Sequence, residues 1–367
     1  MTQPVSTTRK KRNLKRNIVR TLVVLLILIV ALVIYNVGGC SRKTTRSIYT
    51  NESNYGYQIK SVGNDILAVN YDGAKFISVD GEEKGVIENH TSNPYVDICG
   101  NYVLLYDKGG NTVSLYNGVK KNFTYECDLV VKKAKVNKDG YVVMVSDEVG
   151  YNSRISVLSN KGIVQYIWKI GDVYIIDADI SPDNRRVAVA AISTDTGVIV
   201  ENIIFADINK EEEISRVKNE GSMPLYVSYT DSGSSVVVSD DRLCGYNSSG
   251  EQKWDVSYDN RLLNSFEVDQ KGNTVLALAG IKNNTVLEMY TKNGHKSGEY
   301  VTESKVKSLH LNDKYIAVCE PAQVSVINYS GRLLENIDIQ KEYTDILITD
   351  RRNVILMSTG GIERLTF

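Results

Sequence analysis

Between residues 181 and 189 the chain reads Ser181-Pro182-Asp183-Asn184-Arg185-Arg186-Val187-Ala188-Val189, a polar turn that leads into a short apolar run. The same arrangement recurs eight times, with apolar runs that begin at Ile66, Val103, Val142, Val187, Val236, Val275, Ile316 and Val354. Successive runs begin 37, 39, 45, 49, 39, 41 and 38 residues apart. This spacing matches the ~40–45 residues of a four-stranded propeller blade. The repeat therefore predicts an all-β chain built as a β-propeller.

A second family of turns follows the apolar runs in phase. Its members are Asp80-Gly81, Asn117-Gly118, Lys161-Gly162, Asn209-Lys210, Ser249-Gly250, Asn293-Gly294 and Ser330-Gly331. Asn-Gly and Asp-Gly favour tight hairpins because the central residues need positive φ. If the strands of a blade are lettered a to d, the first turn family joins strand a to a buried strand b, and the second joins c to d. We therefore predict eight four-stranded blades.

The last blade lacks its fourth strand, because the chain ends at Phe367 after the eighth strand c. The unassigned extended segment around Ser47-Ile48-Tyr49 precedes the first blade. We expect it to serve as strand d of the last blade, which would close the ring and remove its unpaired sheet edge. The alternative is a ring of seven blades, with the first or last repeat packed outside it.

The N-terminal region predicts one transmembrane helix. Residues 21–37 read TLVVLLILIVALVIYNV, a run without charge in which thirteen residues are Leu, Ile or Val. Ile18 and Val19 extend this run toward the ~20 residues that a bilayer requires. Seven basic residues precede it and three follow closely, so the positive-inside rule places the N-terminus in the cytoplasm. The predicted parts are a cytoplasmic basic tail (1–17), a transmembrane helix (18–38), a linker (39–46) and an extracytoplasmic propeller (47–367).

A cleaved signal peptide is the alternative for this region. Gly38, Gly39 and Cys40 resemble the end of a bacterial lipobox, in which the cysteine is lipidated after cleavage. Asn36 stands where that pattern has an apolar residue, and the apolar run is longer than a signal peptide requires. Under either interpretation the propeller is anchored outside the cytoplasm.

The charge of the chain is divided unevenly. The first 46 residues contain ten basic residues and no acidic ones, which leaves 33 basic against 44 acidic residues in the remainder. An acidic body repels phosphate backbones, so nucleic acid is not expected as a partner.

Two motifs resemble known propeller families. The stretch from Ser181 to Val189 looks like the S-P-D-G-x-x-hydrophobic signature of WD40-like and YVTN-type blades. Gly250-Glu251-Gln252-Lys253-Trp254 resembles the G-x-x-x-W turn of quinoprotein-like blades. With its N-terminal anchor, the chain is similar to a family of uncharacterised bacterial membrane-anchored propeller proteins. This resemblance implies a fold and a location, but no activity.

Sequence motifs for catalysis, for metal and for cofactor binding are missing: no P-loop, dinucleotide fingerprint, G-x-S-x-G or H-E-x-x-H occurs. His90, His295 and His310 are far apart in sequence, and we expect His310 to line the channel on a strand a. The five cysteines form no C-x-x-C pair, so neither a zinc site nor a disulfide framework is expected. We predict no catalytic residue, no metal and no cofactor.

Binding residues are expected on the longest b-to-c connections. These connections are residues 147–153 of the third blade and 193–202 of the fourth. Function often lies on loops that a rigid scaffold carries. The candidate binding face comprises Asp147, Tyr151, Asn152, Asp195 and Thr196. The alternative is that both connections are insertions without function.

Three functions remain open. The favoured one is a surface scaffold or accessory subunit that docks another envelope or secreted protein, because large rigid loop faces suit this role. The second is a receptor for a small ligand or glycan, which would need a polar or aromatic pocket in the central channel. The third is an envelope hydrolase or lyase, which would need a histidine beside a carboxylate or a serine.

Overall fold

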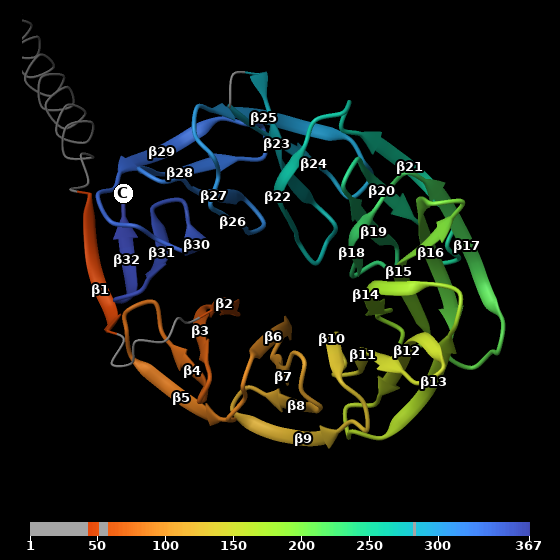
Figure 1. Cartoon of the computed structure of the whole chain (residues 1–367). Coiled ribbons are helices and arrows are strands. Elements are labelled where there is room, and N and C mark those ends of the chain that lie inside the picture. The colour runs from red at the N-terminus through yellow and green to blue at the C-terminus, as the bar shows by residue number, and fades with distance from the viewer. Residues whose placement is uncertain (1–42, 51–57, 282–283) are drawn as a thin grey trace, which may run out of the picture. The chain divides into compact units, whose positions relative to one another are not determined.

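The structure, a computed structural model, describes residues 43–50, 58–281 and 284–367. These residues form 32 β-strands and no α-helix. The strands pair into eight sheets of four strands each. Figure 1 shows the sheets following one another in chain order around a central axis.

We letter the strands of each blade a to d from the axis outward. The inner strands a are β2 (Gln58–Val62), β6 (Pro94–Cys99), β10 (Val131–Val136), β14 (Tyr174–Ile180), β18 (Pro224–Tyr229), β22 (Leu263–Val268), β26 (Ser308–Leu311) and β30 (Asp345–Asp350). The strands b are β3 (Asp65–Asn70), β7 (Tyr102–Asp107), β11 (Val142–Glu148), β15 (Arg186–Asp195), β19 (Ser235–Ser239), β23 (Thr274–Ala279), β27 (Tyr315–Cys319) and β31 (Asn353–Ser358). The strands c are β4 (Gly73–Ile77), β8 (Thr112–Asn117), β12 (Tyr151–Leu158), β16 (Val198–Asp207), β20 (Arg242–Tyr246), β24 (Thr285–Tyr290), β28 (Gln323–Asn328) and β32 (Gly361–Thr366). The outer strands d are β5 (Glu83–Glu88), β9 (Lys120–Glu126), β13 (Val164–Ile170), β17 (Glu213–Glu220), β21 (Gln252–Ser257), β25 (Lys296–Thr302), β29 (Leu333–Asp338) and β1 (Thr44–Thr50).

The eight predicted apolar runs are the eight strands b. They are apolar on both faces because each sheet packs between two neighbouring sheets, so both sides of strand b are covered. The cores lie between the blades: one cluster, for example, joins Leu104 and Leu115 of blade 2 to Ala134 and Met144 of blade 3. The outer strands instead alternate between half-buried and exposed residues, as in Gln252–Ser257.

The N-terminal strand closes the ring. The sheet of the last blade has the order β1-β32-β31-β30, as the strand count predicted, and the seven-blade alternative is wrong. Ile48 and Tyr49 pack against a cluster that combines Ile59 and Ile66 of blade 1 with Ile355 of blade 8. A Cβ on Gly81, which has φ of +92°, would lie 2.5 Å from the carbonyl oxygen of Ile48, so only glycine allows the blade 1 turn to approach β1 this closely.

The two ends of the ring carry different connections. The a-to-b and c-to-d turns form what we call the ab face, and the b-to-c and d-to-a connections form the bc face. Every strand d therefore runs from the ab face to the bc face. In Figure 1, β1 runs opposite to its neighbour β32, so Thr44 lies at the ab face.

The predicted cytoplasmic tail and transmembrane helix lie outside the described residues. The strand β1 begins at Thr44, so three residues assigned to the linker belong to the propeller. Among the residues that the structure describes, no helix is long and apolar enough to cross a bilayer.

Candidate functional site

A central cavity opens where the inner strands reach the ab face. It has a volume of about 1470 Å³, and all eight blades contribute to its wall. Each inner strand lines this wall with two or more residues. We take one of them from each strand and call the set the channel ring: Lys60, Asp97, Lys135, Asp179, Ser228, Glu267, His310 and Leu347. Seven of the eight are polar or charged, whereas the strands b behind them are apolar.

An ion-pair network ties blades 3, 4 and 5 together beside this ring. The carboxylate of Asp177, which is fully buried, accepts the Lys135 Nζ at 2.6 Å and the Lys133 Nζ at 2.9 Å. The Lys135 Nζ also donates to the carbonyl oxygen of Val227 at 2.7 Å and lies 4.0 Å from the ring centre of Tyr226. Burial lowers the pKa of Lys135, but the charge of Asp177 outweighs it and holds the pKa above its usual value. Lys135 is therefore a permanent cation in the channel wall.

Other ring side chains hold the next blade in register. Asp97 accepts the backbone N–H of Val136 at 2.8 Å, and Asp179 accepts that of Tyr229 at 2.7 Å. The His310 Nδ1 accepts the N–H of Ile348 at 3.1 Å. An inner strand is the edge of its sheet, so the backbone N–H groups on the side away from strand b have no partner strand and need other hydrogen-bond acceptors. These side chains supply them, which explains why polar residues stand here.

Burial shifts the pKa values of three residues of the channel ring, Asp97, Asp179 and His310. It raises the pKa of Asp97, and it raises the pKa of Asp179 to about 7, although Lys135 and the backbone donor of Tyr229 oppose it. It lowers the pKa of His310 to about 4, so this imidazole is neutral near pH 7.

Glu267 differs from the other ring acids because none of the described residues donates a hydrogen bond to its carboxylate. It is partly exposed to the cavity, and desolvation by the walls raises its pKa to about 7, with Lys60 opposing and Asp345 adding to the shift. This carboxyl is therefore free to bind a proton or another partner.

The variant Glu267→Gln tests this environment. An acid whose pKa is raised by folding binds its proton more tightly in the folded state, so stability falls as pH rises from the ordinary pKa of 4.5 to the folded pKa of about 7, and the full loss is present above it. We expect Glu267→Gln to stabilise the chain by about 2 kcal/mol at pH 8 and to change stability by less than about 0.5 kcal/mol at pH 4. Urea unfolding of the wild type and of Glu267→Gln between pH 4 and pH 8 measures the difference in the free energy of unfolding. The contributions of Asp179 and His310 are present in both proteins and cancel in this difference. An equal effect at both pH values would contradict the raised pKa.

The predicted binding residues all lie on the bc face. Asp147 is the residue before the last of β11 and pairs with Lys132 of its own blade. The exposed ring of Tyr151 lies 5.7 Å from the Nζ of Lys169. Asn152 follows on β12, and Asp195 and Thr196 are exposed at the tip of the blade 4 hairpin. The structure places the two sets on neighbouring blades, and their role in binding stays a prediction.

The two long connections are extended hairpins. The strands β15 and β16 have ten residues each and pair up to Asp195 and Val198, which leaves Thr196 and Gly197 as the turn. Both turn residues have positive φ, at 48° and 88°, as a tight hairpin requires. The extra residues therefore form a rigid projection of blade 4.

Exposed apolar side chains gather on the same face. Of the 17 large apolar residues that are exposed in the described part of the chain, eleven lie in bc-face connections or at the strand ends beside them. Besides Tyr71 and Val301 there are nine, all in blades 3 to 6, and we call these nine the apolar arc: Val130, Val149, Tyr151, Tyr174, Val198, Ile199, Met223, Leu262 and Ile281. The bc-face connections of blades 7 and 8 contribute none among the described residues, so the arc occupies one side of the ring.

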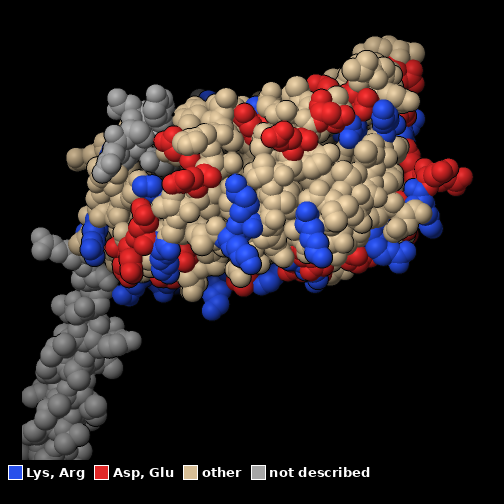
Figure 2. All heavy atoms as spheres, turned by 90° about the horizontal axis from the view of Figure 1, so that it is seen from below, with Lys and Arg blue, Asp and Glu red and all other residues tan. Residues whose placement is uncertain are grey.

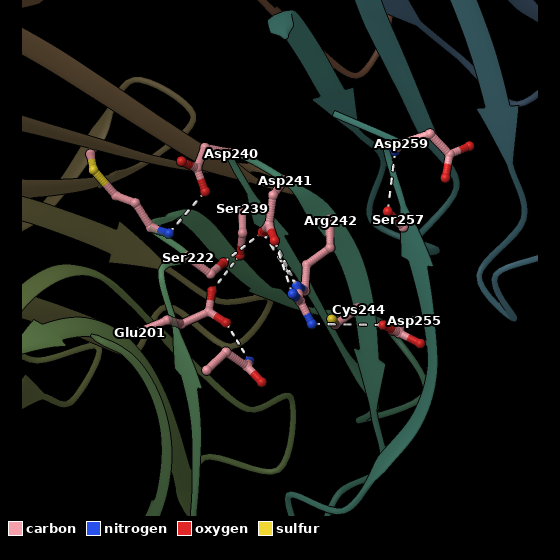
Figure 3. Close-up of polar contacts among 12 residues, drawn as sticks. Glu201, Ser222, Ser239, Asp240, Asp241, Arg242, Cys244, Asp255, Ser257 and Asp259 are labelled. Atoms are coloured by element: carbon pink, nitrogen blue, oxygen red, sulfur yellow. Dashed lines mark hydrogen bonds and ion pairs between the residues drawn. The ribbon is translucent and has the colours of Figure 1, made fainter. Parts of the chain in front are cut away.

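A polar network supports the arc between blades 4 and 5 (Figure 3). The hydroxyl of Ser239 and the amide of Asn219, at 2.6 Å, both donate to the buried carboxylate of Glu201. Burial raises the pKa of Glu201, and these two donors oppose the rise. Ser222 donates to Asp241 at 2.6 Å, and Arg242 pairs with Asp241 at 2.9 Å. The network fixes the two loops that carry Met223 and Asp240.

The histidines do not converge. His310 lies in the channel ring as predicted, His295 lies in a turn of the ab face, and His90 follows β5 at the bc face, where it is 3.4 Å from Asp72. Within the part of the chain that the structure describes, His, Cys, Asp and Glu side chains form no cluster of three that could hold a metal ion.

Of the channel ring, only His310 was predicted from the sequence. Lys60, Asp97, Lys135, Asp179 and Glu267 were missed because each is a single polar residue in its own strand. The available signal was a polar residue that recurs in seven of the eight strands a.

The sheet order, the closing strand and the channel define the class of the protein as an eight-bladed, all-β propeller. A family model described as a family of unknown function, DUF5711, matches residues 40–367. The chain belongs to this family.

Solved structures share the propeller fold. BamB from Moraxella catarrhalis is similar with a TM-score of 0.54 and 12% identity, over 89% of this chain and 99% of that one. The C-terminal WD40 domain of Sif2 has a TM-score of 0.64 and 11% identity, again over 89% and 99%. The propeller domain of Cps50 (Swd1) from Myceliophteria thermophila has a TM-score of 0.51 and 12% identity, over 88% and 100%. No curated protein sequence matches the chain.

Proposed function

We propose that this protein is a membrane-anchored, extracytoplasmic scaffold whose bc face docks another envelope or secreted protein. The apolar run of residues 18–38, with its basic flank, would serve as the anchor. No catalytic step, cofactor or nucleic acid enters this proposal. The propeller fold is consistent with it, because a rigid ring presents many loops on one surface.

The apolar arc is the observation that carries the proposal. Val149, Ile281 and Leu262 are 88%, 84% and 74% exposed. Clustered exposed apolar residues mark protein–protein contact sites. Their restriction to blades 3–6 defines one side of the ring as the contact.

Site-specific photocrosslinking in living cells tests this proposal. We expect a photoreactive residue at Val149 or Leu262 of the full chain to capture one discrete protein. The matched control position is Ile163, an apolar residue of the ab face that is 58% exposed. We expect it to capture that protein at least about tenfold less. Equal capture at Ile163, or capture of lipid alone from the bc face, would contradict a docking role.

The central cavity favours a second candidate, a receptor for a small polar ligand or glycan. Its wall combines the free carboxyl of Glu267 with Lys60 and the rings of Tyr226 and Phe266. Thermal shifts of the wild type and Glu267→Gln with a panel of amino acids and oligosaccharides test it. A ligand that stabilises only the wild type would support it, and a panel without any shift would speak against it.

A further inference from the structure

The apolar arc carries an excess of acidic side chains. Asp195, Glu220 and Asp259 are exposed in its loops, and within the described residues none of them forms an ion pair, although the charge of Asp259 helps to raise the pKa of Arg261. By contrast, Lys132 pairs with Asp147, and Arg216 pairs with Asp172 at 2.5 Å.

The basic residues of these loops are therefore largely neutralised. Lys169 pairs with Glu148 at 3.3 Å, and Arg242 and Arg261 pair with acids of their own blades. Among the described residues of these loops, Lys218 on β17 is the one basic side chain without an acidic partner. Asp240 is a fourth exposed acid of these loops that forms no ion pair, so among the described residues the carboxylates without an ion pair outnumber the amines.

Figure 2 views the ring edge-on from the side of β5, β9 and β13. Acidic side chains lie along most of its upper rim, and the lower rim carries basic and acidic side chains together. A partner that docks by its charge as well as its apolar residues would distinguish the two rims.

We infer that the apolar arc binds a protein segment that is rich in Lys or Arg and carries apolar side chains. This inference rests on the proposed docking function and names the chemistry of the partner. The apolar side chains of the segment would pack among Val149, Leu262 and Ile281, and its basic side chains would pair with Asp195, Glu220 and Asp259. Charge pairing of this kind steers association and selects the partner.

Other occupants of the arc are disfavoured by the same charges. A bilayer with anionic lipids would repel the three carboxylates, because membrane-binding surfaces carry basic residues around their apolar ones. A second copy, docked face to face, would oppose acids to acids. A basic partner segment is the occupant whose charge matches.

The test uses two synthetic peptides with the full chain in detergent micelles. Both peptides carry the same apolar residues on one helical face, and the other face has Lys in one and Glu in the other. We expect the Lys peptide to bind at least about tenfold more tightly than the Glu peptide. Fluorescence anisotropy at low and at physiological salt measures both affinities.

Charge-reversed variants locate the binding. The triple variant Asp195→Lys, Glu220→Lys, Asp259→Lys is expected to bind the Lys peptide about tenfold more weakly than the wild type. The matched control reverses three exposed acids of the ab face, Glu82→Lys, Glu211→Lys and Glu212→Lys, and is expected to retain binding. The double variant Leu262→Ser, Ile281→Ser should also weaken binding, since it removes apolar contacts and keeps the charge.

Three results would overturn the inference. If both triple variants lose the same affinity for the Lys peptide, binding depends on the total charge of the protein and not on the arc. Binding of phosphatidylglycerol vesicles through the arc would identify a lipid surface instead. If photocrosslinking captures a protein whose contacting segment is acidic, the docking function stands and only the chemistry proposed here fails.

Discussion

Deletion of β1 (residues 44–50) is expected to lower the melting temperature of the full chain by about 10 °C. The strand supplies the fourth row of backbone hydrogen bonds in the last blade and packs Ile48 and Tyr49 against both end blades. Loss of this apolar burial and of several backbone hydrogen bonds costs about 5 kcal/mol, and each kcal/mol corresponds to roughly 2 °C in a domain of this size. Differential scanning calorimetry measures the shift.

Point variants separate the packing of β1 from its length. Ile48→Ser with Tyr49→Ser removes the half-buried side chains and should reproduce about half of the effect. Thr45→Ser with Thr50→Ser changes exposed positions of the same strand and should shift melting by less than about 1 °C. A deletion that leaves the melting temperature unchanged would show that the ring is held closed without β1.

The architecture could be predicted because its determinants are local and repeated. Each strand b is a continuous apolar run after a polar turn, and eight copies in phase leave little freedom in the fold. The closing strand followed from counting, since the last sheet lacked one member and Ser47-Ile48-Tyr49 was the extended segment without a place.

The channel ring could not be predicted in the same way, because its contacts are made between blades. Lys135 meets Asp177, and Asp179 meets Tyr229, across 42 and 50 residues of sequence. Each is one polar residue in a short strand, and strand patterns do not show which neighbour it will contact. The arc was hidden for a related reason, since its members lie in loops of four different blades.

The hairpin of blade 4 shows a further limit of sequence reasoning. Residues 193–202 were identified as a long connection because the repeat is longest there. In the structure the additional residues lengthen the paired strands β15 and β16, and only a two-residue turn joins them. The length of an insertion does not reveal whether the added residues form a loop or continue the hydrogen-bonded pairing of the two strands.

Replacement of Lys135 by methionine is expected to destabilise the propeller by about 3 kcal/mol. The variant removes one of the two cations that neutralise Asp177, whose side chain has no exposed surface. Removing one partner of a buried ion pair leaves the other charge without compensation, and this cost exceeds the loss of the pair as a whole. Urea unfolding at pH 7 measures the change.

The matched control is Lys132, three residues earlier on the same strand. Lys132 also pairs with an aspartate, Asp147, but both side chains are about half exposed. Water and salt screen such a pair, so Lys132→Met should cost less than about 0.5 kcal/mol. Similar losses in the two variants would contradict a buried charge at Asp177.

A double variant separates the charge from the packing around it. Asp177→Asn keeps an acceptor for the N–H of Val227, which Asp177 now accepts at 3.0 Å, and removes the uncompensated charge. Combined with Lys135→Met, it should recover about 2 kcal/mol of the single-variant loss. Lys133, whose side chain is 32% exposed, can then turn to solvent. Recovery would show that the loss in Lys135→Met comes from the charge of Asp177, which Lys133 alone does not compensate.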